Sequence, residues 1–192
     1  MILIIDNYDS FTYNLMQYAG MISNDVVLYK NDNPKIKAFD FKQVSHIIIS
    51  PGPGNPLDAN LSHYVLAIAE KEKIPLLGVC LGHQLIAMHY GAKIIPAKNI
   101  MHGKLSKINV VNKCEIYKGI EANFFATRYH SLFVDSNKMP NSLRITSIDD
   151  DNNEIMGIHH KNFPIYGIQF HHDSIQTKCG YKMIENFLNI VV

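Results

Sequence analysis

Short apolar runs that alternate with helix-like segments in the first half of the chain constrain the fold more than any other feature. The runs at residues 2–5, 26–29, 46–49 and 75–79 are too short for helices and, apart from His46, are apolar, as strands buried on both faces are. Helical spacing begins after Ser10, the expected N-cap, and recurs at residues 61–71 and 83–90, with Gly91 just past the last turn. This alternation predicts a doubly wound sheet.

The second half of the chain has a different pattern, in which strands follow one another. Strands are expected at residues 107–111, 126–134, 143–148, 155–159 and 165–170, and an Asp/Asn-rich turn at 149–153 joins two of them. A last helix is expected at residues 181–190. No shift in composition marks a domain boundary. We therefore expect one domain, residues 1–192, of the α/β class, with three layers and a mixed, mostly parallel central sheet flanked by helices.

Composition excludes several classes of protein. Apolar residues make up 47% of the 192 residues and the formal net charge is +1, so neither disorder nor a nucleic-acid or membrane partner is indicated. The first residues lack the pattern of a secretory signal, and the three cysteines, Cys80, Cys114 and Cys179, have no paired spacing. We expect a cytoplasmic protein without disulfides.

Cys80 lies in the pattern G-x-C-x-G, directly after an expected buried strand and before an expected helix. This is the setting of a nucleophile elbow, in which a sharp turn lifts the side chain clear of the sheet and flanking glycines relieve crowding. A helix N-terminus beneath the sulfur favours the thiolate, and the N–H of Leu81 faces the same point. The competing interpretation is a buried structural cysteine. The strand–turn–helix setting favours a nucleophile.

A thiolate nucleophile needs a histidine, and the stretch QFHHDS offers two, at the end of an expected strand. Sites in sheets of this class lie beyond the carboxyl ends of strands, where Cys80 also lies. If the chain stays extended here, His171 shares a face with Asp173, whereas His172 points the other way. We therefore expect His171 to work with Cys80 and Asp173 to orient it. Diverging neighbouring histidines also argue against a metal site.

Longer motifs resemble a known family. GVCLGHQ at residues 78–84, SPGPGNP at 50–56 and the H-x-acid-S ending are similar to class I glutamine amidotransferases, which have a flavodoxin-like fold. DNYDSFTYNL at 6–15, MHGK at 101–104 and TRYHSL at 127–132 resemble, within that family, the small glutaminase subunits of anthranilate synthase and aminodeoxychorismate synthase. The resemblance covers nearly the whole chain.

The resemblance implies a function and a set of site residues. Glutamine would be hydrolysed to glutamate and ammonia through a γ-glutamyl thioester on Cys80, with His171 as base and then acid and Asp173 as its acceptor. Neither a cofactor nor a metal is implied. The ammonia would pass to a larger chorismate-binding subunit for anthranilate or aminodeoxychorismate synthesis. The residues that would hold glutamine and its oxyanion are Gly52, Pro53, Gly54, Leu81, Gln84, Ser131 and Leu132.

The chain departs from the family pattern at the acidic member of the triad. The family reads F-H-P-E-S, whereas this chain reads F-H-H-D-S, so His172 replaces a rigid proline and Asp173 replaces a longer glutamate. One alternative is therefore a catalytically impaired regulatory or binding subunit, and another is that His172 interferes or substitutes. An amidotransferase for a different acceptor, such as GMP synthetase, and a cysteine hydrolase acting on another amide or ester are further alternatives.

Overall fold

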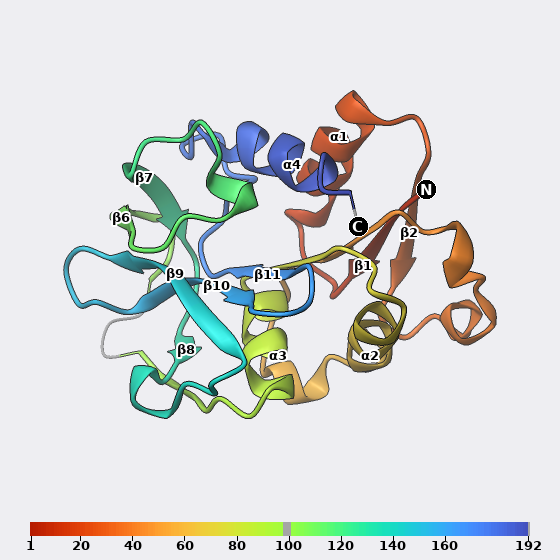
Figure 1. Ribbon diagram of the computed structural model, residues 1–192, viewed down its shortest axis with the longest axis horizontal. Helices are drawn as coiled ribbons and strands as arrows, with labels where there is room; N and C mark the ends of the chain where they lie inside the picture. Colours follow the sequence, from red (N-terminus) through yellow and green to blue (C-terminus); the bar gives the residue numbers. More distant parts are fainter. Residues whose placement is uncertain (98–100, 192) are drawn as a thin grey trace.

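The chain folds around one long sheet, as seen in the computed structural model, which describes residues 1–97 and 101–191 (Figure 1). The nine strands of this sheet follow the order β2-β1-β3-β4-β11-β10-β9-β6-β7. The first five are parallel neighbours and are β2 (Val26–Lys30), β1 (Ile2–Asp6), β3 (His46–Ile49), β4 (Leu76–Val79) and β11 (Ile165–Ile168). The other four are antiparallel neighbours and are β10 (Ile155–His160), β9 (Leu143–Asp149), β6 (Lys104–Val110) and β7 (Asn123–Arg128).

Because two successive antiparallel steps restore direction, β9 and β7 point the same way as the parallel strands, whereas β10 and β6 run against them. The mixed, mostly parallel sheet expected from the sequence is thereby confirmed. A separate two-stranded sheet pairs β5 (Ile94–Pro96) with β8 (Leu132–Val134). Short 3-10 turns cover the residues Pro34–Ala38, Phe41–Gln43, Pro56–Asp58, Glu115–Tyr117 and Ser136–Lys138.

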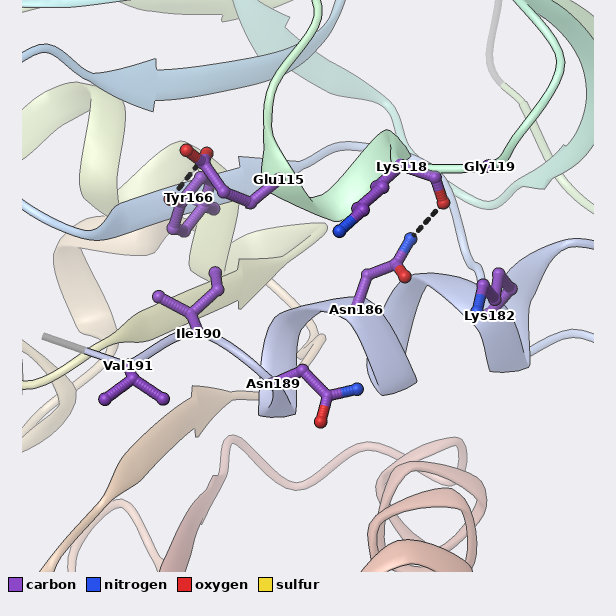
Figure 2. Close-up of a pocket in the computed structure, with 9 residues that line it drawn as sticks. All are labelled: Glu115, Lys118, Gly119, Tyr166, Lys182, Asn186, Asn189, Ile190 and Val191. Carbon is purple, nitrogen blue, oxygen red and sulfur yellow. Dashed lines mark hydrogen bonds between the residues drawn. The ribbon is translucent and has the colours of Figure 1, made fainter.

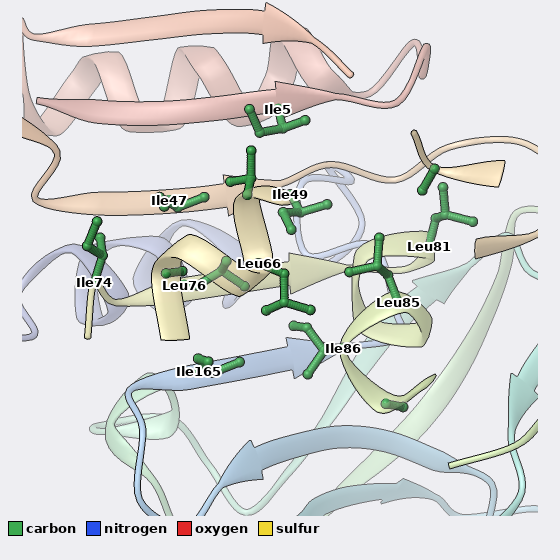
Figure 3. Packing of buried hydrophobic residues seen from close by; sticks show 14 of the residues in the cluster. Ile5, Ile47, Ile49, Leu66, Ile74, Leu76, Leu81, Leu85, Ile86 and Ile165 are labelled. Atoms are coloured by element: carbon green, nitrogen blue, oxygen red, sulfur yellow. The ribbon is translucent and has the colours of Figure 1, made fainter. Parts of the chain in front are cut away.

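Helices cover both faces of the sheet. Figure 1 shows α1 (Thr12–Ile22) and α4 (Gly180–Leu188) on one side and α2 (Ser62–Glu72) and α3 (Leu81–His89) on the other. Each face has its own apolar core. Figure 3 shows the core under α2 and α3, where Leu66 and Leu85 pack near Ile47 and Ile49 of β3. The second core joins α1 and α4 to the opposite face. No helix among residues 1–97 and 101–191 is long and apolar enough to span a bilayer.

Two local predictions were wrong. The expected strand at residues 126–134 is two strands, β7 and β8, because the chain leaves the sheet between Arg128 and Leu132. Ser10 does not cap α1, whose N-cap position is Phe11 without a capping side chain. The turn before α1 is instead held by Asp6, whose Oδ1 accepts hydrogen bonds from Tyr8 N, Asp9 N and the Thr12 hydroxyl. A carboxylate at the end of β1 thus replaces the cap.

Candidate active site

Cys80 stands on the predicted elbow between β4 and α3. Its backbone angles, φ 51° and ψ −99°, are rare for a residue with a side chain and mark local strain. The flanking glycines have a steric cause: a Cβ on Gly78 would lie 2.4 Å from the Gly82 carbonyl oxygen, and one on Gly82 would lie 2.5 Å from the Ile49 carbonyl oxygen. The G-x-C-x-G spacing therefore lets helix α3 pack tightly against the sheet directly behind the sulfur.

The N-terminus of α3 provides a polar environment for this sulfur. Cys80 occupies the N-cap position and Leu81 is the first helical residue, so the Leu81 N–H has no partner within the helix. Free N–H groups and the helix dipole at this end favour negative charge. The same N–H group is available to a developing oxyanion beside the sulfur.

His171 lies one strand away from Cys80. Strand β11, which precedes it, is the parallel neighbour of β4, and Ile168 pairs with Val79 at the ends of the two strands. The backbone after β11 is held by Thr127, whose carbonyl accepts from His171 N at 2.8 Å, and by Thr177, whose hydroxyl donates to the His171 carbonyl at 2.8 Å. Adjacent strand ends therefore bring the two side chains together, as the sequence predicted.

Asp173 reaches His171 by a different route from the one expected. The chain turns after His171, with Ser174 N donating to the His171 carbonyl at 3.3 Å, so the alternation of an extended strand does not apply. The Nδ1 of His171 still lies 3.3 Å from Oδ1 of Asp173. The separation is that of an ion pair, but its direction does not satisfy a hydrogen bond for either atom. The proposed contact is present, and the reasoning from strand alternation was wrong.

The surroundings of His171 favour its charged form. Burial lowers the pKa of His171, but the nearby Asp173 carboxylate and Cys80 sulfur outweigh burial and raise the pKa well above its ordinary value of 6.5. Two aromatic rings also hold the imidazole in place, with centroids 4.9 Å away for Phe11 and 5.0 Å for Tyr129. Asp9 is a second carboxylate near the pair, and burial raises its pKa.

His172 is separate from this arrangement. Its ring is fully buried and has no hydrogen-bond partner in the described part of the chain. Burial lowers the pKa of His172 to about 4, so the ring is neutral at pH 7. Its carbonyl abuts the start of α4, where a Cβ on Gly180 would clash with it. These contacts give His172 a packing role and argue against its acting in place of His171.

A cavity of about 220 Å³ opens beside Cys80. It is smaller than the ~300–1,000 Å³ clefts that hold drug-sized ligands, so it suits a ligand about as large as an amino acid. The sequence missed two of its lining residues, Tyr129 and His130, which lie in the TRYHSL segment where the chain leaves β7. The other residues that line it are Cys80 and all seven expected to hold glutamine, namely Gly52, Pro53, Gly54, Leu81, Gln84, Ser131 and Leu132.

The loop at residues 51–54 is held in place by Asn7, whose role the sequence did not reveal. Asn7 donates its side-chain amide to the Ser50 carbonyl at 2.9 Å, and its backbone N–H donates to the Ser50 hydroxyl at 2.8 Å. A Cβ on Gly52 would lie 2.6 Å from the Asn7 Cβ and 2.7 Å from a Leu81 methyl group. Glycine is required here because the loop packs against both β1 and α3. The available signal was the polar DNYD stretch at the end of a buried strand.

A larger open cleft, of about 670 Å³, shares no lining residue with this cavity. Figure 2 shows the side chains that line it. The cleft runs beside α4, where Tyr166 donates its hydroxyl to Glu115 at 2.8 Å and Asn186 donates to the Lys118 carbonyl at 2.7 Å. Neither a cysteine nor a histidine is among the residues that line it. Size alone would favour this cleft, but the strained Cys80 lines the smaller cavity and places the reactive centre there.

Comparisons with known proteins identify the family to which the chain is similar. A family model described as glutamine amidotransferase class-I matches residues 3–191. The chain is 47% identical to the anthranilate synthase component 2 of Saccharolobus solfataricus, covering 98% of both, and 43% identical to the aminodeoxychorismate/anthranilate synthase component 2 of Bacillus subtilis, covering 98% of this chain and 95% of that protein. It is also 47% identical to the bifunctional protein TrpGD of Thermotoga maritima, but spans 32% of that longer protein.

Similarity to solved structures extends over the whole fold. The crystal structure of a glutamine amidotransferase from Thermotoga maritima aligns with a TM-score of 0.79. The alignment covers 97% of this chain and 95% of that one, at 16% sequence identity. At this identity the likeness concerns the fold alone.

Proposed function

Because the chain belongs to the class-I glutamine amidotransferase family, we propose that it is the glutaminase subunit of a chorismate-aminating synthase. It hydrolyses L-glutamine to glutamate and ammonia and passes the ammonia to a larger chorismate-binding subunit. The relatives' names cover both anthranilate and aminodeoxychorismate synthesis, so both kinds of partner are candidates. The whole chain forms one amidotransferase domain and acts in the cytoplasm, where Cys80 stays reduced.

The proposed reaction begins with Cys80. Its sulfur attacks the side-chain amide carbon of glutamine bound in the cavity, and the N–H of Leu81 with that of a glycine in the loop at residues 51–54 stabilise the oxyanion. His171 accepts the thiol proton and donates it to the leaving ammonia, which leaves a γ-glutamyl thioester. Water, activated by the same histidine, then hydrolyses the thioester and releases glutamate. Asp173 holds the imidazole during these steps.

One observation carries the proposal: the strained Cys80 opens onto a cavity that all seven expected glutamine-binding residues line. A structural cysteine would have no need of strained backbone angles or of a ligand-sized space. The family's usual ending, F-H-P-E-S, is altered to F-H-H-D-S, which motivates the alternative of a silent binding subunit. Against it stands the short separation between His171 and Asp173.

The test is ammonia release from glutamine by the purified chain, alone and with each of the two candidate chorismate-binding subunits, beside a Cys80→Ser control. Release that needs Cys80 and rises with one partner supports the proposal and identifies the acceptor. Release of equal size without any partner would favour a free-standing cysteine hydrolase. No release from a complex whose formation is confirmed would favour the silent binding subunit.

A further inference from the structure

Gln169 is a fully buried amide that the reaction as described does not use. It lies between the end of β11 and His171, and its backbone N–H donates to the Met156 carbonyl at 2.9 Å. Its side-chain nitrogen Nε2 lies 3.5 Å from Sγ of Cys80, within hydrogen-bonding range for sulfur. A buried amide pointing at a reactive sulfur requires an explanation beyond packing.

The orientation of the Gln169 amide follows from its partners. An amide's oxygen and nitrogen have nearly the same shape, so neighbouring donors and acceptors must decide which atom faces the sulfur. The side-chain nitrogen of Gln84 donates to the Leu132 carbonyl at 2.9 Å, because a carbonyl can only accept. The same nitrogen donates to Oε1 of Gln169 at 3.0 Å. With its oxygen engaged there, Gln169 presents its nitrogen to Cys80.

A buried charge fixes the far end of this chain of hydrogen bonds. Arg128, which only donates, gives a hydrogen bond from Nε to Nε2 of His130 at 2.9 Å, so the proton of this imidazole must sit on Nδ1. That Nδ1 donates to the Leu132 carbonyl at 2.9 Å. Burial, followed by Arg128, lowers the pKa of His130 to about 3, which keeps the ring neutral. The Leu132 carbonyl therefore accepts hydrogen bonds from His130 Nδ1 and from Gln84 Nε2. Its contact with Gln84 fixes which end of the Gln84 amide faces Gln169.

We propose that Gln169 is a further catalytic residue, which donates a hydrogen bond to the Cys80 sulfur and stabilises its thiolate before attack on the amide. This inference rests on the proposed glutaminase function. A hydrogen bond to the charged form of a group favours that form, and in a buried site the effect is larger than in water. Gln84 and the Leu132 carbonyl hold the donor in place.

The test measures thiolate formation directly, with a readout that does not depend on turnover. The rate of Cys80 alkylation by iodoacetamide is followed from pH 5 to 10, with peptide mass spectrometry to separate Cys80 from Cys114 and Cys179. Three variants remove the hydrogen bond from the Gln169 amide to the Cys80 sulfur. Gln169→Met keeps the length of the side chain, and Gln169→Asn keeps an amide that is too short to reach the sulfur. Gln169→Glu places a carboxylate beside the sulfur. Gln17→Met, at an exposed position on α1, is the matched control.

We expect the midpoint of the alkylation profile to rise by about one pH unit in Gln169→Met and Gln169→Asn, and further in Gln169→Glu, because a carboxylate repels the thiolate. Glutaminase kcat should fall about tenfold in the first two variants with little change in KM. The control should match the wild-type chain. A midpoint that stays at the wild-type value in folded Gln169→Met and Gln169→Glu overturns the proposal, even if turnover falls. A raised midpoint in a chain that releases no ammonia would keep this inference and refute the glutaminase function.

Discussion

Lowering the pH from 7 to 5 is expected to destabilise the fold, and His172 is one source of the effect. Its ring is fully buried without a hydrogen-bond partner among the described residues, and burial lowers its pKa to about 4, with smaller effects from Asp173, which raises the pKa, and from His171, which lowers it. In the unfolded chain a histidine has a pKa of about 6.5 and takes up its proton over this range. Because the unfolded state then binds more protons, the free energy of unfolding falls as the pH falls.

The size of the effect follows from the two pKa values. Above pH 7 both states are neutral at this position and His172 contributes no pH dependence. Between pH 7 and 5 the unfolded chain gains most of a proton that His172 in the folded chain does not, which corresponds to about 2 kcal/mol. His83 is also fully buried, with a pKa lowered to about 4 by burial, and adds a similar amount.

Urea unfolding followed by circular dichroism at pH 7 and pH 5 measures this dependence. His172→Leu and His172→Gln both remove the titrating ring but differ in packing, so each should lose about 2 kcal/mol less than the wild-type chain over the same interval. Comparing the change in the free energy of unfolding between pH 7 and pH 5 removes any effect that the substitutions have on stability at pH 7. If both variants lose as much unfolding free energy between pH 7 and pH 5 as the wild-type chain does, the assignment of a buried neutral imidazole at this position is refuted.

Three further experiments test other parts of the structure. Gly82→Ala should destabilise the fold by about 2 kcal/mol or more in urea titrations, because its Cβ meets a backbone carbonyl, whereas Gly20→Ala, with open space around it in α1, should stabilise by about 0.5–1 kcal/mol. Arg128→Met should cost about 3–5 kcal/mol by leaving two buried carboxylates unpaired, and Lys107→Met, in an exposed pair, should cost less than about 1 kcal/mol. Asp173→Asn should lower partner-stimulated kcat on the order of 10²-fold, and undiminished turnover would remove this residue from the triad.

The parts of the site that the sequence could predict are those set by local geometry. The elbow at Cys80 depends on a strand, a turn and two glycines within five residues, so its spacing is visible in the sequence. The position of His171 followed from a general property of parallel sheets, whose strand ends share one edge. The glutamine-binding residues came from a resemblance between whole motifs, and the structure brings all seven to one cavity.

What the sequence could not show depends on contacts between distant segments. Asp173 meets His171 through a turn whose shape is fixed by Thr127 of β7 and by Thr177, whose hydroxyl accepts from Thr127 N at 3.1 Å. Strand β7 ends at Arg128, whose side chain forms buried ion pairs with Asp149 and Glu154 of the β9–β10 hairpin. Apolar periodicity carries no information about such pairings, so it predicted one strand in place of two.

The adjacency of β4 and β11 has a consequence for how the chain can be altered. Cys80 and His171 are far apart in sequence, but Cys80 follows directly on β4 and His171 lies three residues past the end of its parallel neighbour β11, so the register of these two strands brings both to the same edge of the sheet. The chain between them, from α3 to the β9–β10 hairpin, supplies cavity-lining residues such as Gln84 and Leu132 but is not part of the β4–β11 pairing. Fragments ending and beginning at the Asp150–Asn153 turn should therefore reassemble into an active split enzyme, since the β4–β11 ladder that fixes the register of the two strands forms between the two pieces.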